Sequence, residues 1–182
     1  PWRAPLRCQG DALLVVHLAK GGPPQLLDLW LQLLLAAAAA PTSGRIPGRG
    51  VLIARDKGDQ FATTTLRPPD PEAARLELER LAALREQWRG SCWPVPPRTG
   101  WRWWEQERRG ESGLAAARQT WEGGPMQGGE RQRAEMVACF GGDLPVAALL
   151  AAPFAVLAEQ LFEPVQAAVA PKPKASGRGS KR

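Results

Sequence analysis

The first hydrophobic positions along the chain predict a strand followed by a buried helix. Ala12–Leu18 is a continuous apolar run with glycines on both sides, as expected for a strand buried on both faces. Gln25–Ala40 is apolar except for polar side chains spaced three or four residues apart, which form one narrow stripe on a helix. These polar positions are Gln25, Asp28 and Gln32.

Two further strand-like runs, Gly50–Arg55 and Gln60–Leu66, are separated by a short polar segment that contains Gly58. This pattern predicts an antiparallel hairpin. A strand, a helix and another strand in this order predict a right-handed crossover between two parallel strands. The expected fold class is therefore α/β with a mixed sheet.

A second helix is predicted to begin at Asp70, because Asp is a good N-cap and Pro71 suits the first helical position. Its apolar residues recur every three or four positions and define one core face. They are Ala74, Leu78, Leu81, Leu84 and Trp88. Gly90 is expected to end this helix.

The remainder of the chain has helical composition with frequent breaks. Prolines 94, 96 and 97 predict an extended connector. Helical turns are expected within Trp101–Glu107, Leu114–Trp121 and Glu130–Phe140, with a glycine-rich linker between the last two. We find no internal repeat.

The last apolar segment, Leu144–Ala170, follows Asp143, a plausible helix cap. Pro153 and Pro164 interrupt this segment, and proline inside a helix removes a hydrogen bond and clashes with the preceding turn. The segment is therefore expected to be divided into short helices.

Charge is concentrated at the end of the chain. The 182 residues carry a net charge of +6, from 24 basic and 18 acidic side chains. Five of the basic residues lie in the last eleven positions, which leaves 19 basic against 18 acidic residues elsewhere. These candidate DNA-binding residues are Lys172, Lys174, Arg178, Lys181 and Arg182. Residues 171–182 are expected to be a disordered tail that either contacts DNA non-specifically or only keeps the chain soluble.

Other features limit the cellular context. The chain begins at Pro1 without a leader, so we expect it to be part of a longer polypeptide. The most apolar run, Leu26–Ala40, is interrupted by polar residues and is shorter than the roughly 20 residues of a membrane span. Three separated cysteines suggest neither a zinc site nor a disulfide framework, and a reducing cytoplasm fits them. His17 stands alone and is interpreted as structural.

The sequence lacks the full set of metal ligands that a nuclease of the PD-(D/E)xK type requires. A PD-(D/E)xK nuclease needs an Asp on one strand and, at the end of the next strand, a second carboxylate two residues before a Lys, so that both carboxylates hold Mg²⁺. Asp11 and Lys20 are present, but Leu18 occupies the position of the second carboxylate. No metal site is therefore predicted. Gly123–Gly129 lacks the ending of a phosphate-binding loop and is interpreted as a linker.

The segment Trp93–Arg109 combines four tryptophans with four arginines. Exposed rings and arginines can form a stacking platform for nucleic acid, but tryptophans are also frequent anchors in cores and interfaces. Glu105 and Glu107 would repel a phosphate backbone on the same face. The preferred interpretation is an extended strap whose rings anchor it against protein. The anchors are Trp93, Trp101, Trp103 and Trp104.

Several short motifs occur in an order that resembles the C-terminal region of RecC, the gamma subunit of exodeoxyribonuclease V. They are LLDLW at 26–30, the helix ending at Trp88, WPVPPRTGW, Trp121 before a GGE, CFGGDLP, and FAVLAEQLFEP. The resemblance extends over nearly all of residues 1–170, which are expected to form one nuclease-like domain. In the related nucleases a helix carries Gln and Tyr, and Gln25 occupies a similar helix here.

The resemblance implies a part of the RecBCD complex, with RecB and RecD as partners and double-stranded DNA ends and single-stranded DNA as ligands. It implies a degenerate PD-(D/E)xK core that guides DNA strands during double-strand break repair by homologous recombination. No cofactor is expected in this segment, because ATP and Mg²⁺ belong to the whole complex. Two alternatives stay open, an active Mg²⁺-dependent nuclease and a free-standing module that binds nucleic acid through its tail.

Overall fold

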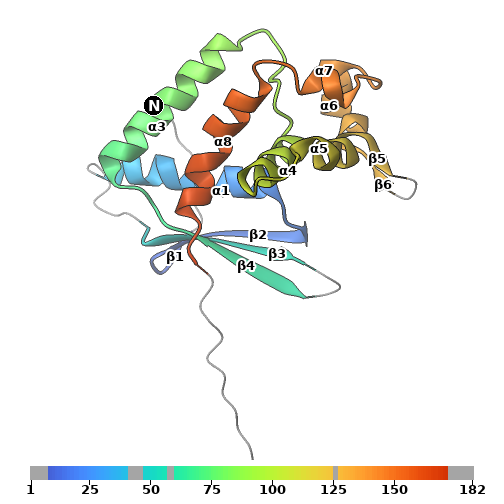
Figure 1. Ribbon diagram of the computed structural model, residues 1–182. Coiled ribbons are helices and arrows are strands. Elements are labelled where there is room, and N and C mark those ends of the chain that lie inside the picture. Colours follow the sequence, from blue (N-terminus) through green and yellow to red (C-terminus); the bar gives the residue numbers. More distant parts are fainter. Residues whose placement is uncertain (1–7, 41–46, 57–59, 125–126, 172–182) are drawn as a thin grey trace, which may run out of the picture.

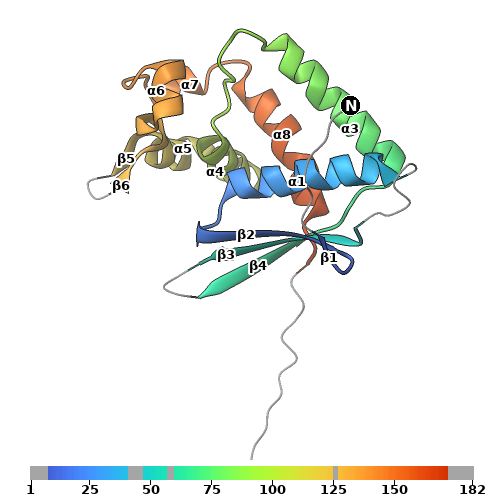
Figure 2. The same cartoon turned by 180° about the vertical axis from the view of Figure 1, so that it is seen from behind.

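A computed structural model describes residues 8–40, 47–56, 60–124 and 127–171. In chain order its elements are β1 (Cys8–Gln9), β2 (Ala12–Lys20), α1 (Pro23–Ala38), β3 (Arg49–Arg55), β4 (Phe61–Leu66), α3 (Pro71–Gln87), α4 (Pro97–Arg108), α5 (Gly113–Glu122), β5 (Gly123–Gly124), β6 (Gln127–Gly128), η1 (Glu130–Gln132), α6 (Ala134–Phe140), α7 (Val146–Leu149) and α8 (Phe154–Ala168). The described helices all lie on one side of the main sheet (Figures 1 and 2).

The main sheet has the order β1-β2-β3-β4. β2 and β3 are parallel and are joined through α1, whereas β3 pairs with β4, and β1 with β2, in the antiparallel sense. The predicted α/β class and the mixed sheet are confirmed. At the far edge, Val169 forms a bridge with Leu66, and the Ala170 N–H donates to the Thr65 carbonyl at 2.8 Å.

The two faces of this sheet differ in their surroundings. Leu13, Leu52 and Leu66 point toward α1 and are buried. The register pairs Val16 with Ile53 on the opposite face, which none of the described helices covers. Val16 is 54% exposed there and Phe61 is 55% exposed. The prediction that the first strand is buried on both faces is wrong, because the described residues provide only one helical layer.

Helix α1 is set against the sheet by local features of its sequence. Gln25 supplies one half of a capping box at its first turn, where the side-chain Oε1 accepts a hydrogen bond from the Gly22 N–H at 3.0 Å. Leu29 and Leu33 then pack onto β3 at Gly50. A Cβ at Gly50 would lie 2.6 Å from Leu33 Cδ1, so a larger residue would force Leu33 to move and would weaken this close approach of helix and strand.

Helix α3 begins as predicted, with the Asp70 carboxylate accepting hydrogen bonds from the Glu72 N–H at 3.0 Å and the Ala73 N–H at 2.9 Å. Gly90 follows the helix with a positive φ of 81°. Ala74 is buried, and Leu78 and Leu81 are partly buried against the core around the sheet. The helix is thus amphipathic, as its periodicity predicts.

Helix α8 corrects the predicted division at Pro164, because the helix continues through this residue to Ala168. Pro164 has no N–H to donate to the Gln160 carbonyl one turn earlier. Arg80 of α3 supplies the missing donor, with its Nη2 2.8 Å from that carbonyl oxygen. Glu77 holds the same guanidinium through two hydrogen bonds of 2.8 and 2.6 Å. A long-range contact therefore overrides the local effect of the proline.

Three other expectations change in the second half of the chain. The extended connector ends at Pro96, because Pro97 is the first residue of α4, where a missing N–H costs nothing. Asp143 does not cap a helix, since α7 begins after Pro145. Part of the glycine-rich linker forms a small antiparallel ladder between β5 and β6.

The buried side chains form two cores. The sheet core contains mainly aliphatic residues of the sheet, α1 and the end of α8. The aromatic core lies between the connector, α4, α5, α7 and the start of α8. No helix in the described ranges is long and apolar enough to cross a membrane.

Candidate functional site

The candidate nuclease residues Asp11 and Lys20 lie at opposite ends of the same strand. Lys20 ends β2 and Asp11 immediately precedes it, so nine residue steps separate them. At about 3.3 Å per residue, this places their Cα atoms roughly 30 Å apart. Asp11 instead lies beside Arg49, with Oδ1 3.6 Å from Nη2, and both side chains are exposed. The two residues cannot serve a common metal or water.

The remaining residues of a nuclease-like site offer no substitute ligands. Leu18 is 76% exposed on β2, and the amide oxygen of Gln25 is used in capping α1. His17 is partly buried and lies in register with Ala54. Within the part of the chain that the structure describes, no group of three or more His, Cys, Asp or Glu residues could hold a metal ion.

The four tryptophans singled out in the sequence belong to the aromatic core. Trp104 is buried, at 4% exposed, whereas Trp93, Trp101 and Trp103 are partly buried against the same core. Phe162 of α8 lies 5.4 Å from Trp101 and 6.0 Å from Trp104, measured between ring centroids. These rings are packed mainly within the chain itself. A contact of the partly exposed rings with another subunit stays a prediction.

Glycine again permits a close approach in the aromatic core. A Cβ at Gly100 of α4 would lie 2.5 Å from Val95 and 3.0 Å from the Phe162 ring. The connector and α8 can therefore contact α4 directly at this turn. One turn further along α4, Trp103 packs edge-to-face on Phe154 with 5.4 Å between ring centroids.

The arginines of the tryptophan segment are largely paired with glutamates. Glu105 accepts from Arg102 at 3.0 Å and from Arg109 at 2.9 Å. Arg108 binds Glu163 of α8 at 2.9 Å and lies over the Trp104 ring, 5.0 Å from its centroid. This arrangement leaves little free positive charge along α4 for a phosphate backbone.

Glu130 is a structural residue that the sequence did not indicate. It is 4% exposed and lies at the amino end of α4. Its carboxylate accepts hydrogen bonds from the Arg98 N–H at 3.0 Å, the Thr99 N–H at 2.6 Å and the Thr99 hydroxyl at 2.7 Å. Glu130 thus caps α4 from a distant segment, where the negative charge also suits the helix dipole. The N-cap of α4 is Pro96, whose side chain cannot accept a hydrogen bond. This missing local cap is the only feature of the sequence that suggests a cap from elsewhere in the chain.

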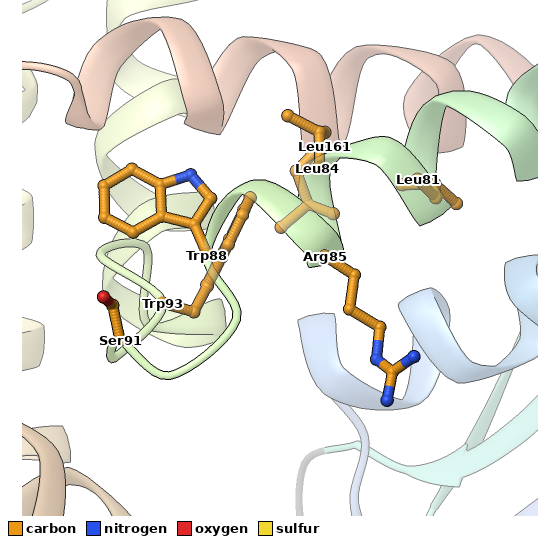
Figure 3. Close-up of a pocket in the computed structure, with 7 residues that line it drawn as sticks. All are labelled: Leu81, Leu84, Arg85, Trp88, Ser91, Trp93 and Leu161. Carbon is orange, nitrogen blue, oxygen red and sulfur yellow. The ribbon is translucent and has the colours of Figure 1, made fainter.

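An apolar pocket of about 270 Å³ opens between α3, the connector and α8 (Figure 3). The Trp88 and Trp93 rings, which meet edge-to-face at 6.1 Å, form one wall. The other lining residues are Leu81, Leu84, Arg85, Ser91 and Leu161. Arg85 is the only charged group among them, so the pocket suits burial of an apolar side chain and not acid–base or metal chemistry.

Two of the cysteines meet beside this pocket. Cys92 follows Ser91 in the connector, and its thiol donates a hydrogen bond to the Cys139 carbonyl of α6 at 3.3 Å. A side-chain hydrogen bond with the Cys139 thiol raises the pKa of Cys92, and burial and the charge of the neighbouring thiolate add to the effect. Cys8 lies in β1, more than 80 positions before Cys92 in the sequence. No motif or spacing in the sequence indicates that Cys92 and Cys139 meet.

The five tail residues proposed to bind DNA, Lys172 to Arg182, lie outside the described residues. Their role stays a prediction.

Comparison with known proteins gives one family. A family model described as the RecC C-terminal domain matches residues 3–108, which include the main sheet, α1, α3 and α4. The match is shorter than the expected resemblance and does not include α5 to α8. The search of curated proteins gave no match.

Proposed function

Since this chain belongs to the RecC C-terminal domain family, we propose that it is a non-catalytic, structural and strand-guiding part of the RecBCD complex. Membership of the family connects the chain with exodeoxyribonuclease V, with DNA repair and recombination, and with RecB and RecD as partner subunits. The absence of catalysis, the guiding of DNA and the surfaces involved are the proposal.

The separation of Asp11 from Lys20 carries the proposal that the domain is inactive. A two-carboxylate Mg²⁺ site requires its ligands within a few ångströms of one ion. Here roughly 30 Å of strand separates the acid from the lysine, and Leu18 stands where a second carboxylate would be needed. We propose that this α/β domain with a mixed sheet is a degenerate PD-(D/E)xK core that lacks the metal ligands.

The uncovered face of the sheet supports a role in a larger assembly. Parallel strands are normally covered on both faces, yet Val16, Ile53 and Phe61 line a face without a described layer. Apolar side chains grouped in this way typically mark a surface that another polypeptide covers. We propose that this open face, defined by these three residues, packs against another part of the RecBCD complex.

The nuclease part of the proposal is tested with the purified 182-residue chain. Linear duplex and single-stranded DNA are incubated with Mg²⁺ or Mn²⁺, and Asp11→Ala serves as the matched variant. We expect no hydrolysis above buffer with either protein. Turnover that is lost in Asp11→Ala would overturn the proposal and favour an active metal-dependent nuclease.

The assembly part is tested by charging the open face. Val16→Glu is placed on this face, and Leu76→Glu is the control, because Leu76 is similarly exposed, at 59%, on α3. Both variants should keep the thermal stability of the parent chain. Val16→Glu should reduce co-purification with RecB and RecD at least tenfold, and Leu76→Glu should not. Equal co-purification of both variants would exclude the open face as the assembly surface.

The DNA-guiding part rests on the basic tail. Each neutralised phosphate contributes about 0.9 to the slope of log affinity against log salt, so five cations give a slope no steeper than about −4.5. Removal of residues 171–182 should abolish most of the DNA affinity of the chain. Unchanged affinity after this truncation would assign DNA binding to the folded surface.

A further inference from the structure

Two thiols from separate segments meet at the surface of the aromatic core. Cys92 lies in the connector after α3, and Cys139 lies 47 positions later, in the last turn of α6. The Cys92 Sγ is 3.3 Å from the Cys139 carbonyl oxygen, so both cysteines occupy the same small region. Cys139 is exposed and Cys92 is partly exposed, which leaves the pair accessible to a small reagent.

We propose that Cys92 and Cys139 form a redox-responsive modification site that closes an intramolecular disulfide between the connector and α6. The Cys92 Sγ already contacts the main chain of Cys139. A change of side-chain rotamer can therefore bring the sulfur atoms of the two cysteines together. The disulfide would join two segments. Cys92 lies between Ser91 and Trp93, which both line the apolar pocket, and Cys139 precedes Phe140, whose ring packs on Trp121.

The reaction proceeds by thiol–disulfide exchange with a small disulfide such as oxidised glutathione. The Cys139 thiolate attacks one sulfur of the oxidant and releases one glutathione thiol. The Cys92 thiol then loses its proton and attacks the mixed disulfide at the Cys139 sulfur, which releases a second glutathione thiol. Two protein thiols are oxidised to one disulfide, and one glutathione disulfide is reduced to two thiols.

The order of the two attacks follows from the environment of each sulfur. The more exposed Cys139 meets the reagent first. Cys92 has a raised pKa and therefore a smaller thiolate fraction near neutral pH. A resolving thiol that is held next to its target does not need a large thiolate fraction, because the second attack is intramolecular.

A disulfide at this position would stabilise the aromatic core. It closes a loop of about 47 residues that contains α4 and α5, and loops of this length lose substantial chain entropy when cross-linked. It would also fix the connector that forms one wall of the apolar pocket. For a domain of this size we expect the midpoint of thermal unfolding to rise by about 5–15 °C on oxidation.

The test uses the purified 182-residue chain, equilibrated with defined ratios of reduced to oxidised glutathione and then treated with an alkylating reagent. Peptide mass spectrometry should show one species in which the peptides of Cys92 and Cys139 are joined, with Cys8 alkylated. Dithiothreitol should reverse both this species and the rise in thermal midpoint. Cys139→Ser and Cys92→Ser should each abolish the effect, whereas Cys8→Ser should retain it.

The proposal is overturned by either of two results. One is glutathione that stays attached to Cys139 while Cys92 is alkylated, and the other is oxidation that joins only Cys8 of two molecules. Neither result depends on binding of DNA or of partner subunits, so this inference and the proposed function can fail independently.

Discussion

The sheet core and the aromatic core of the molecule are held together in different ways. In the sheet core, main-chain hydrogen bonds fix the positions of the strands, and aliphatic side chains such as Leu33 and Leu52 fill the space beneath α1. In the aromatic core, short helices are positioned by individual contacts, such as Phe162 against Trp101 and Glu130 at the start of α4. No ladder of main-chain hydrogen bonds holds the helices of the aromatic core in place. We therefore expect a substitution that changes the shape of a buried side chain to disturb the aromatic core more than the sheet core.

Phe162→Ala should give the largest effect, because this ring contacts two tryptophans and the backbone near Gly100. We expect a loss of about 3–5 kcal/mol in the free energy of unfolding. Leu33→Ala in the sheet core is the matched change and should cost about 2–5 kcal/mol. The comparison is made by urea denaturation, followed by far-UV circular dichroism and by tryptophan fluorescence.

The two probes distinguish a local from a global effect. Phe162→Ala should shift tryptophan fluorescence toward longer wavelength even in the absence of urea, whereas Leu33→Ala should not. Identical native spectra for both variants would mean that the aromatic core repacks as readily as the aliphatic one.

Glu130→Gln compares a cap supplied from a distant segment with the local cap at Asp70. The substitution removes the charge and one acceptor oxygen from a buried site that serves three donors. We expect a loss of about 2–3 kcal/mol. Asp70→Ala, at an exposed helix start, should cost about 1 kcal/mol. A smaller loss for Glu130→Gln than for Asp70→Ala would show that the buried carboxylate contributes little.

Arg80→Met tests the link between α3 and the proline-containing turn of α8. Loss of the guanidinium leaves the Gln160 carbonyl without its donor and should cost about 1–2 kcal/mol. With Pro164→Ala, the new N–H can bond this carbonyl within the helix. A double-mutant cycle should therefore give a coupling of at least about 0.5 kcal/mol. Strict additivity would mean that Arg80 and Pro164 act independently.

The smallest effect is expected for Asp11→Ala, at the exposed turn before β2. Its ion pair with Arg49 spans 3.6 Å between two solvent-exposed side chains. Such pairs contribute little, so the free energy of unfolding should change by no more than about 0.5 kcal/mol. A loss above 1.5 kcal/mol would indicate a structural role that the geometry does not reveal.

Sequence patterns predicted most of the sheet core, because its elements follow local rules. The hairpin, the crossover helix and the Asp70 cap each depend on residues close together in the chain. The open face of β2 is not evident from the sequence, because an apolar run looks the same whether one or two layers cover it. Local rules also failed at Pro164, where the compensating donor lies on Arg80.

The candidate site was less accessible to sequence reasoning. The missing carboxylate at Leu18 was evident from spacing, and the opposed ends of β2 agree with it. The Glu130 cap and the meeting of Cys92 with Cys139 could not be predicted, because each joins segments more than 30 positions apart without a recognisable motif. Pairs of this kind become visible only when the fold brings them together.

The return of the chain to β4 at Val169 has a consequence for synthesis on the ribosome. The N–H of Ala170 and the carbonyl of Ala168 bond the edge of β4 about a hundred positions after that strand was made. Until α8 has emerged, β4 presents unpaired main-chain groups and the aromatic rings of α4 lack Phe162. Contacts between such distant positions form slowly. The nascent chain therefore carries an open strand edge from the synthesis of β4 to that of Ala170, and exposed rings from the synthesis of α4 to that of Phe162. Chaperones that bind apolar segments would recognise such a chain.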